Sequence, residues 1–171
     1  MNREGLLALH QFNAQANRVV LDVAAQLDEE QFTRDFSPSH GTIRRMLIHM
    51  LGSEAFFLGV VQGAVPDMAA IEALDSLPAI RAHWEQVLTS AEQFIAGQDE
   101  AALQSTVQIR FGEHTLDMTV WQVLLQTFNH AAHHRGELSI LLTELGYPLP
   151  TIDLLIHFVK ASGQHWPFDE N

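Results

Sequence analysis

Two histidines four residues apart have the clearest potential for metal chemistry in this sequence. His130 and His134 lie in the segment NHAAHHRGE, inside a long stretch with a helical pattern. On an α-helix, residues with this spacing project from one face and lie about 6 Å apart along the axis. A helix can therefore offer two imidazoles to one metal ion. Because the chain contains no cysteine, a transition-metal site would have to use His, Asp or Glu.

The neighbours of this pair indicate an interior position. The pair shares its helical stripe with apolar and small residues: Val123, Thr127, Leu138 and Leu141. We therefore expect both imidazoles to point into a helical bundle, where their ring nitrogens need polar partners. A third histidine, His49, lies in the middle of an upstream predicted helix. An inward histidine on a neighbouring helix can complete a three-histidine face that leaves positions open for water or substrate, as in catalytic sites.

A second interpretation treats these histidines as ordinary core residues. Ten histidines in 171 residues make a pair at this spacing common by chance. Met, Phe and Leu residues surround them, and such residues are more typical of a hydrophobic core than of a pocket lining. Glu137 follows His134 by three residues and could orient a ligand, accept a proton or contact solvent.

The remaining histidines carry weaker signals. His133 projects about 100° away from His134, so we expect it at the surface or beside the site. His10 could face the same cavity, although a core or surface position is favoured. His40 is expected in a loop or at a helix cap, where it could meet a substrate, and His157 is expected to pack on the last helix.

Arg135 and Gly136, which follow His134 directly, each carry an expectation about packing. We expect Arg135 to reach solvent or a carboxylate at the bundle surface. Gly136 costs about 1 kcal/mol in the middle of a helix. Close packing of another helix against this position would explain why a glycine is present.

Four long helical patterns should position these side chains. They cover about residues 2–27, 41–63, 77–97 and 119–146, and a shorter one covers 152–161. Ser76 is a good N-cap for the third, and Thr119 with Gln122 resembles a capping box for the fourth. Residues 28–40 are polar and turn-prone, and alternation over 104–118 around Gly112 predicts a β-hairpin. The sequence thus predicts one all-α domain over 1–171, a four-helix bundle with a short hairpin and a short C-terminal helix.

Composition excludes several classes of function. The net charge is −12, and the nine Lys and Arg residues are scattered apart from Arg44 and Arg45. Binding to nucleic acid or to an anionic membrane surface requires clustered basic side chains, so neither is expected. No apolar run approaches the roughly 20 residues of a membrane span, and the N-terminus shows no signal-peptide pattern. With no cysteine for disulfides, we expect a cytoplasmic protein.

Several segments of the sequence resemble a known protein family. His49 within LIHMLGSE, the segment FNHAAHHRGEL, the following LLTELGYP and a closing helix with Asp153 are similar to the DinB/YfiT-like superfamily. The likeness covers nearly the whole chain in element order. It is most specific in HxxxHRG and in the pairing of that motif with the upstream histidine.

The resemblance implies a four-helix bundle, often a homodimer, that holds one divalent metal through His49, His130 and His134. It leaves open whether the ion is Zn, Ni, Fe or Mn. The family name describes induction by DNA damage and implies no DNA contact. Characterised relatives include S-transferases that use low-molecular-weight thiols such as bacillithiol or mycothiol, and a thiol-dependent maleylpyruvate isomerase. For this chain we expect a metal-dependent S-transferase that uses a low-molecular-weight thiol and a small-molecule substrate. A metal-dependent hydrolase that uses metal-bound water and a non-enzymatic metal-binding stress-response protein are the alternatives.

Overall fold

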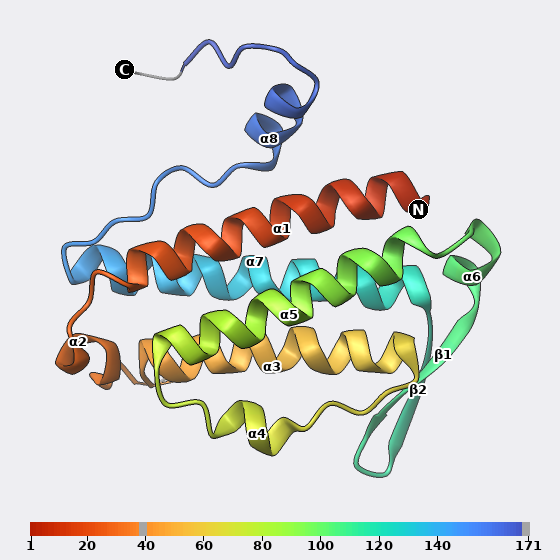
Figure 1. Cartoon of the computed structure of the whole chain (residues 1–171), viewed down its shortest axis with the longest axis horizontal. Coiled ribbons are helices and arrows are strands. Elements are labelled where there is room, and N and C mark those ends of the chain that lie inside the picture. The colour runs from red at the N-terminus through yellow and green to blue at the C-terminus, as the bar shows by residue number, and fades with distance from the viewer. Residues whose placement is uncertain (38–40, 169–171) are drawn as a thin grey trace.

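Four long helices form the body of the structure, a computed structural model that describes residues 1–37 and 41–168. They are α1 (Arg3–Ala24), α3 (Ile43–Gln62), α5 (Leu77–Ala96) and α7 (Val120–Glu144). Helix α1 packs on α5 and α7, and α3 packs on the same two helices. The four helices therefore close into a ring, with α1 and α3 on one diagonal. This confirms the predicted four-helix bundle (Figure 1).

The connection between α3 and α5 sets the direction of the helices. It contains α4 (Met68–Glu72), which packs on α3, and it returns along that helix (Figure 1). As a result α3 and α5 run in the same direction, whereas α7 runs antiparallel to α3. His49, early in α3, can therefore lie at the level of the second half of α7.

Local sequence signals explain where these helices begin and end. The Thr42 hydroxyl accepts a hydrogen bond from the Arg45 N–H at the start of α3, and Gly63 ends that helix with φ +67°. At the start of α7 the Thr119 N–H donates to Gln122 Oε1 at 2.9 Å, which is one half of the predicted capping box. Ser76 is at the N-cap position of α5, but its side chain makes no capping hydrogen bond.

The predicted hairpin is present and covers one end of the bundle. Strands β1 (Thr106–Phe111) and β2 (His114–Thr119) pair antiparallel, with Phe111 opposite His114. Ile109 of β1 is buried in an apolar cluster with residues of all four long helices. A second apolar cluster, which includes Trp84, fills the rest of the bundle. The hairpin is thus fixed to the bundle by an apolar side chain of β1.

Three five-residue helices were not predicted. They are α2 (Glu29–Thr33), α4 and α6 (Glu100–Gln104), so the expectation of an irregular segment over 28–40 is wrong for α2. Each begins at an aspartate whose carboxylate accepts a backbone N–H: Asp28, Asp67 and Asp99. Five residues are too few to show a helical period, so only the caps signalled these helices. The prediction for His40 lies outside the described residues.

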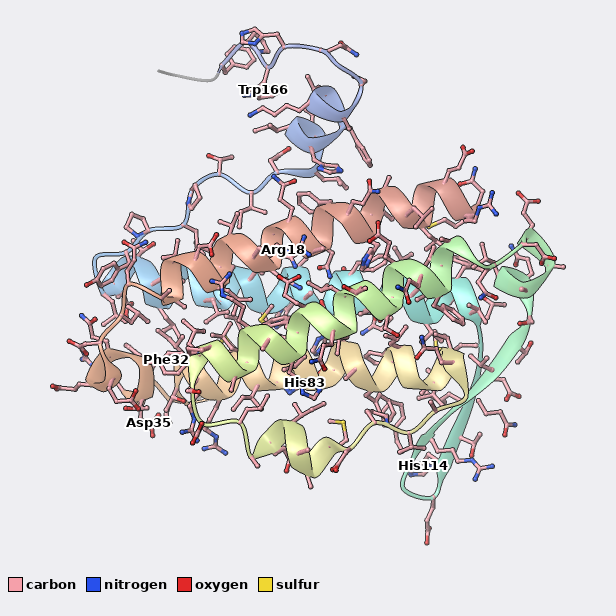
Figure 2. All side chains as sticks on the ribbon, viewed as in Figure 1. Arg18, Phe32, Asp35, His83, His114 and Trp166 are labelled. Carbon is pink, nitrogen blue, oxygen red and sulfur yellow. The ribbon has the colours of Figure 1, made fainter. Side chains whose placement is uncertain are left out.

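The last helix, α8 (Leu154–Ala161), begins at Asp153 and lies beyond α1 at the edge of the bundle (Figure 1). None of its residues is buried. The segment that follows it, with Trp166, lies farther still from the four long helices (Figure 2). In the described part of the chain, no helix is both long and apolar enough to cross a lipid bilayer.

Candidate metal centre

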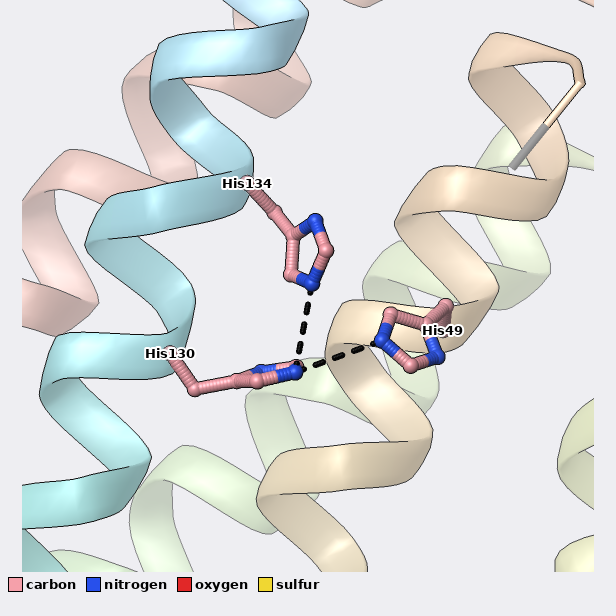
Figure 3. A group of neighbouring side chains, drawn as sticks. All are labelled: His49, His130 and His134. Atoms are coloured by element: carbon pink, nitrogen blue, oxygen red, sulfur yellow. Dashed lines mark hydrogen bonds between the residues drawn. The ribbon is translucent and has the colours of Figure 1, made fainter. Parts of the chain in front are cut away.

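The structure brings the three histidines that the sequence singled out into one group. The Nε2 atom of His130 lies 3.3 Å from Nε2 of His49 and 3.2 Å from Nε2 of His134 (Figure 3). His49 reaches across from α3, whereas His130 and His134 are one turn apart on α7. Three imidazoles from two antiparallel helices thus direct the same ring nitrogen toward one point. We call them the three-histidine group.

The three imidazoles differ in their exposure to solvent, and His134 has a hydrogen-bond partner on its second ring nitrogen. His134 is buried, while His49 and His130 are half-buried. Nδ1 of His134 lies 2.6 Å from Oε2 of Glu137, one turn farther along α7. A carboxylate that accepts the Nδ1 proton fixes the tautomer with Nε2 as the lone-pair atom. Glu137 therefore presents Nε2 of His134 toward the other two histidines as a ligand.

This donor set fits a divalent transition metal. One nitrogen from each histidine lies within 4.8 Å of the others, the separation that a single ion can bridge. Imidazole suits Zn, Ni, Fe and Cu, and three protein ligands leave coordination positions for water or substrate. The three-histidine group could therefore hold a metal ion with an open coordination side.

A pocket of about 790 Å³ opens beside this group. His49 and His130 line it, and residues of α3, α4 and the hairpin form its walls. Its apolar lining residues are Ile48, Phe56, Phe57, Met68, Ile71 and Phe111. Asp35, labelled in Figure 2, lines the pocket near the start of α3, and Phe111 lines it from the hairpin. This volume is typical of a small-molecule site, and we call it the histidine pocket.

Three other histidines lie apart from the histidine pocket. His133 is exposed, with Nε2 3.7 Å from Oε1 of Glu137, as expected for a residue beside the site. His10 is buried in the core against the ring of Phe128, and burial lowers its pKa from 6.5. His157 of α8 packs edge-on against Phe12 of α1, which agrees with the predicted packing role.

A second polar cluster, which sequence reasoning missed, lies inside the bundle. Glu54 is buried at its centre, where Oε1 accepts hydrogen bonds from the amides of Asn13 and Asn17 at 2.7 and 2.8 Å. Its Oε2 accepts from Trp84 Nε1 at 2.6 Å. Nη1 of Arg135 donates to the two asparagine Oδ1 atoms at 2.6 and 2.7 Å. Every long helix contributes to this cluster, which we call the Glu54–Arg135 network.

The structure corrects the expectations for Arg135 and for Gly136. Arg135 is only 7% exposed, so its predicted position at the bundle surface is wrong. Gly136 is also not explained by close helix packing, because a Cβ at this position would meet nothing within 4 Å. A signal for the network existed on α1: Asn13 and Asn17 are four residues apart on an otherwise apolar stripe, where amides need buried partners.

Burial and charge act in opposite directions on the two ionisable groups of the network. Burial raises the pKa of the Glu54 carboxyl, and its three hydrogen bonds and the Arg135 charge oppose that rise. Burial lowers the pKa of the Arg135 guanidinium to about 10, while Glu54 acts in the other direction. Arg135 therefore still carries its charge at neutral pH. Asn13 and Asn17 bridge it to Glu54, because each accepts a hydrogen bond from Arg135 and donates one to the Glu54 carboxyl group.

Comparison with known proteins shows the family and the fold of this chain. The model of the DinB family matches residues 1–164. The chain belongs to the DinB family. No curated protein matches it in sequence.

Two solved structures share the fold. A DinB-like protein from Bacillus cereus ATCC 10987 superposes with a TM-score of 0.72 at 21% identity, over 90% of this chain and all of that one. A DinB-like protein from Bacillus subtilis gives a TM-score of 0.64 at 16% identity, over 85% of this chain and 96% of that one. At these identities the likeness establishes the architecture alone.

Proposed function

We propose that this DinB-family protein is a metal-dependent enzyme that transfers a low-molecular-weight thiol to an electrophilic substrate. The observation that carries the proposal is the convergence of His49, His130 and His134 beside the histidine pocket. A purely structural ion would be enclosed by four protein ligands, whereas three ligands beside a pocket leave room for a reactant.

The chemistry depends on an external thiol. When bound, a divalent ion would lower the pKa of a coordinating thiol and hold it as the nucleophilic thiolate at neutral pH. This chain has no cysteine of its own. The thiol must then come from a cofactor, with bacillithiol and mycothiol as the candidates.

The residues around the group have separate tasks in this proposal. The three histidines supply neutral nitrogen ligands, and the apolar part of the pocket wall contacts the substrate beside the reacting thiol. For Glu137 we propose a positioning role in place of the general base considered from sequence. Its contact of 2.6 Å with His134 Nδ1 supports that assignment.

The test is to load the protein with Zn²⁺, Ni²⁺, Mn²⁺ or Fe²⁺ and to assay conjugation of alkyl and aryl halides with bacillithiol, mycothiol and glutathione. We expect metal-dependent conjugation with at least one thiol, lost in His130→Ala and retained in His133→Ala, which leaves the group intact. Turnover of esters, amides or phosphates without a thiol would favour metal-dependent hydrolysis instead. No turnover at all, with retained metal binding, would favour a non-enzymatic role in a stress response.

We further propose that the protein is a cytoplasmic homodimer. Apolar side chains of α8 support the dimer, because Leu155 and Phe158 are 60% and 43% exposed and no residue of this helix is buried. A second copy that packs on α8 would remove them from water. Light scattering after gel filtration should give twice the chain mass, and the mass of a single chain at micromolar concentration would contradict the dimer.

A further inference from the structure

Two arginines line one end of the histidine pocket, in a chain whose net charge is −12. Arg44 and Arg45 line this end, together with Asp35 and the start of α3. Arg45 precedes His49 by one helical turn, a rise of about 6 Å, so both residues lie on the pocket side of α3. A ligand that occupies the pocket would therefore meet a guanidinium group close to the three-histidine group.

The two guanidinium groups are unpaired within the part of the chain that the structure describes. Within residues 1–37 and 41–168, neither makes an ion pair or a side-chain hydrogen bond, unlike Arg18, which pairs with Glu85 at 2.7 Å. Arg44 is half-buried, so its charge is screened less by water than that of a fully exposed arginine. An arginine that is part-buried in a pocket without an internal partner is suited to bind an anion.

Asp35 lines the same end of the pocket and accepts hydrogen bonds from Ser37. Oδ1 of Asp35 accepts the Ser37 N–H at 2.8 Å and the Ser37 hydroxyl at 2.7 Å. These bonds, with a smaller contribution from the Arg45 charge, hold the pKa of Asp35 below its usual value. Asp35 and Glu72 make the pocket wall neutral in sum, with two positive and two negative side chains. The two carboxylates oppose any added negative charge, so they disfavour a group with one negative charge less than a doubly charged one.

The opposite end of the pocket is aromatic. Phe56 and Phe57 follow His49 by two turns on α3, and the Phe56 ring lies 5.8 Å from the ring of Phe111 on β1. The end with the two arginines, the three-histidine group and the aromatic end therefore follow one another along α3. This order matches a molecule with a charged head, a reactive centre and an apolar body.

We propose that the histidine pocket selects monoanionic organic acids, with the carboxylate held by Arg44 and Arg45 and the apolar body held by Phe56, Phe57 and Phe111. The assignment of this acid as the substrate of the thiol transfer rests on the function proposed above. Binding of the acid itself does not, because it requires only the arginines and the aromatic rings.

Calorimetric titration of the metal-free full-length protein tests the proposal, because a bound ion could itself attract a carboxylate. The probes are 3-phenylpropanoate, its amide, and 2-phenylethylphosphonate, all titrated at a pH above the second pKa of the phosphonate so that this analogue is doubly charged. We expect the carboxylate to bind at least about tenfold more tightly than the amide and more tightly than the phosphonate. Arg44→Gln/Arg45→Gln should remove the preference for the acid over the amide.

Two controls keep the outcomes distinct. Arg34→Gln removes a cation that stacks on Phe36 and does not line the pocket, so it should leave the preference unchanged. His134→Ala removes a ligand of the three-histidine group that does not line the pocket, so it should abolish metal binding and preserve the acid preference. The acid preference can then be measured even if the metal proposal fails. Equal affinity for acid and amide, tighter binding of the phosphonate, or an unchanged preference in the double arginine variant would overturn the inference.

Discussion

The three-histidine group and the Glu54–Arg135 network draw on neighbouring positions of the same helices but face different surroundings. His134 and Arg135 are consecutive on α7, yet one faces the group beside the histidine pocket and the other faces the bundle axis. Successive residues on a helix differ by about 100°, so one turn can serve a ligand site and the core at once. Buried groups that donate and accept among themselves specify packing, whereas nitrogen lone pairs that converge beside a pocket specify a ligand.

The largest expected effect of a single change separates the network from the site. Arg135→Met should lower the free energy of unfolding of the metal-free protein by about 3–5 kcal/mol, because it leaves Glu54 buried without its counter-charge. Urea denaturation measures this. The control Arg81→Met removes an exposed pair with Asp22 and should cost at most about 1 kcal/mol. Equal effects from both variants would mean that the buried network does not organise the bundle.

Metal should stabilise the fold independently of the network. At a free metal concentration of about 100 times Kd, the native protein should gain about 2.7 kcal/mol in unfolding free energy. The unfolding free energy of Arg135→Met should rise by a similar amount when metal is added, under conditions in which this variant is folded. His130→Ala should gain none. If Arg135→Met also lost the increment, the two clusters would be one cooperative unit.

The contact of Glu137 with His134 predicts a smaller effect on metal affinity. Glu137→Ala should weaken metal binding by about 10- to 100-fold, because His134 loses the group that orients its ring. The unfolding free energy without metal should change by no more than about 0.5 kcal/mol. Competition with a chromophoric chelator gives the affinity. His133→Ala is the matched control, and an affinity loss as large as that of Glu137→Ala would argue against this role.

The smallest effect concerns pH and His10. Burial places the folded-state pKa of His10 below its usual value of 6.5, so the unfolded chain binds more protons between those two values. Stability should therefore fall as the pH decreases from 6.5 toward the folded-state pKa. His10→Gln should show a shallower fall over the same range in urea titrations without metal. Parallel curves for the two proteins would show that His10 is not buried in its neutral form.

The long elements and the histidines could be predicted because they repeat or carry distinctive chemistry. Stripes of about 20 residues identify α1, α3, α5 and α7, and the spacing of His130 and His134 on α7 placed both on one face. The partners of Arg135 could not be predicted, because its side chain reaches residues more than 100 positions away on α1. The lining of the histidine pocket was equally hidden, since it combines α3, α4 and the hairpin.

The central claim is that His49, His130 and His134 hold one metal ion. Equilibrium dialysis against Zn²⁺ and Ni²⁺, followed by elemental analysis, tests it most directly on the native chain and on four variants. We expect about one ion per native chain and per His133→Ala chain, and none in His49→Ala, His130→Ala or His134→Ala. Stoichiometric metal that survives removal of any of these three histidines, or that is lost equally from His133→Ala, would contradict the account.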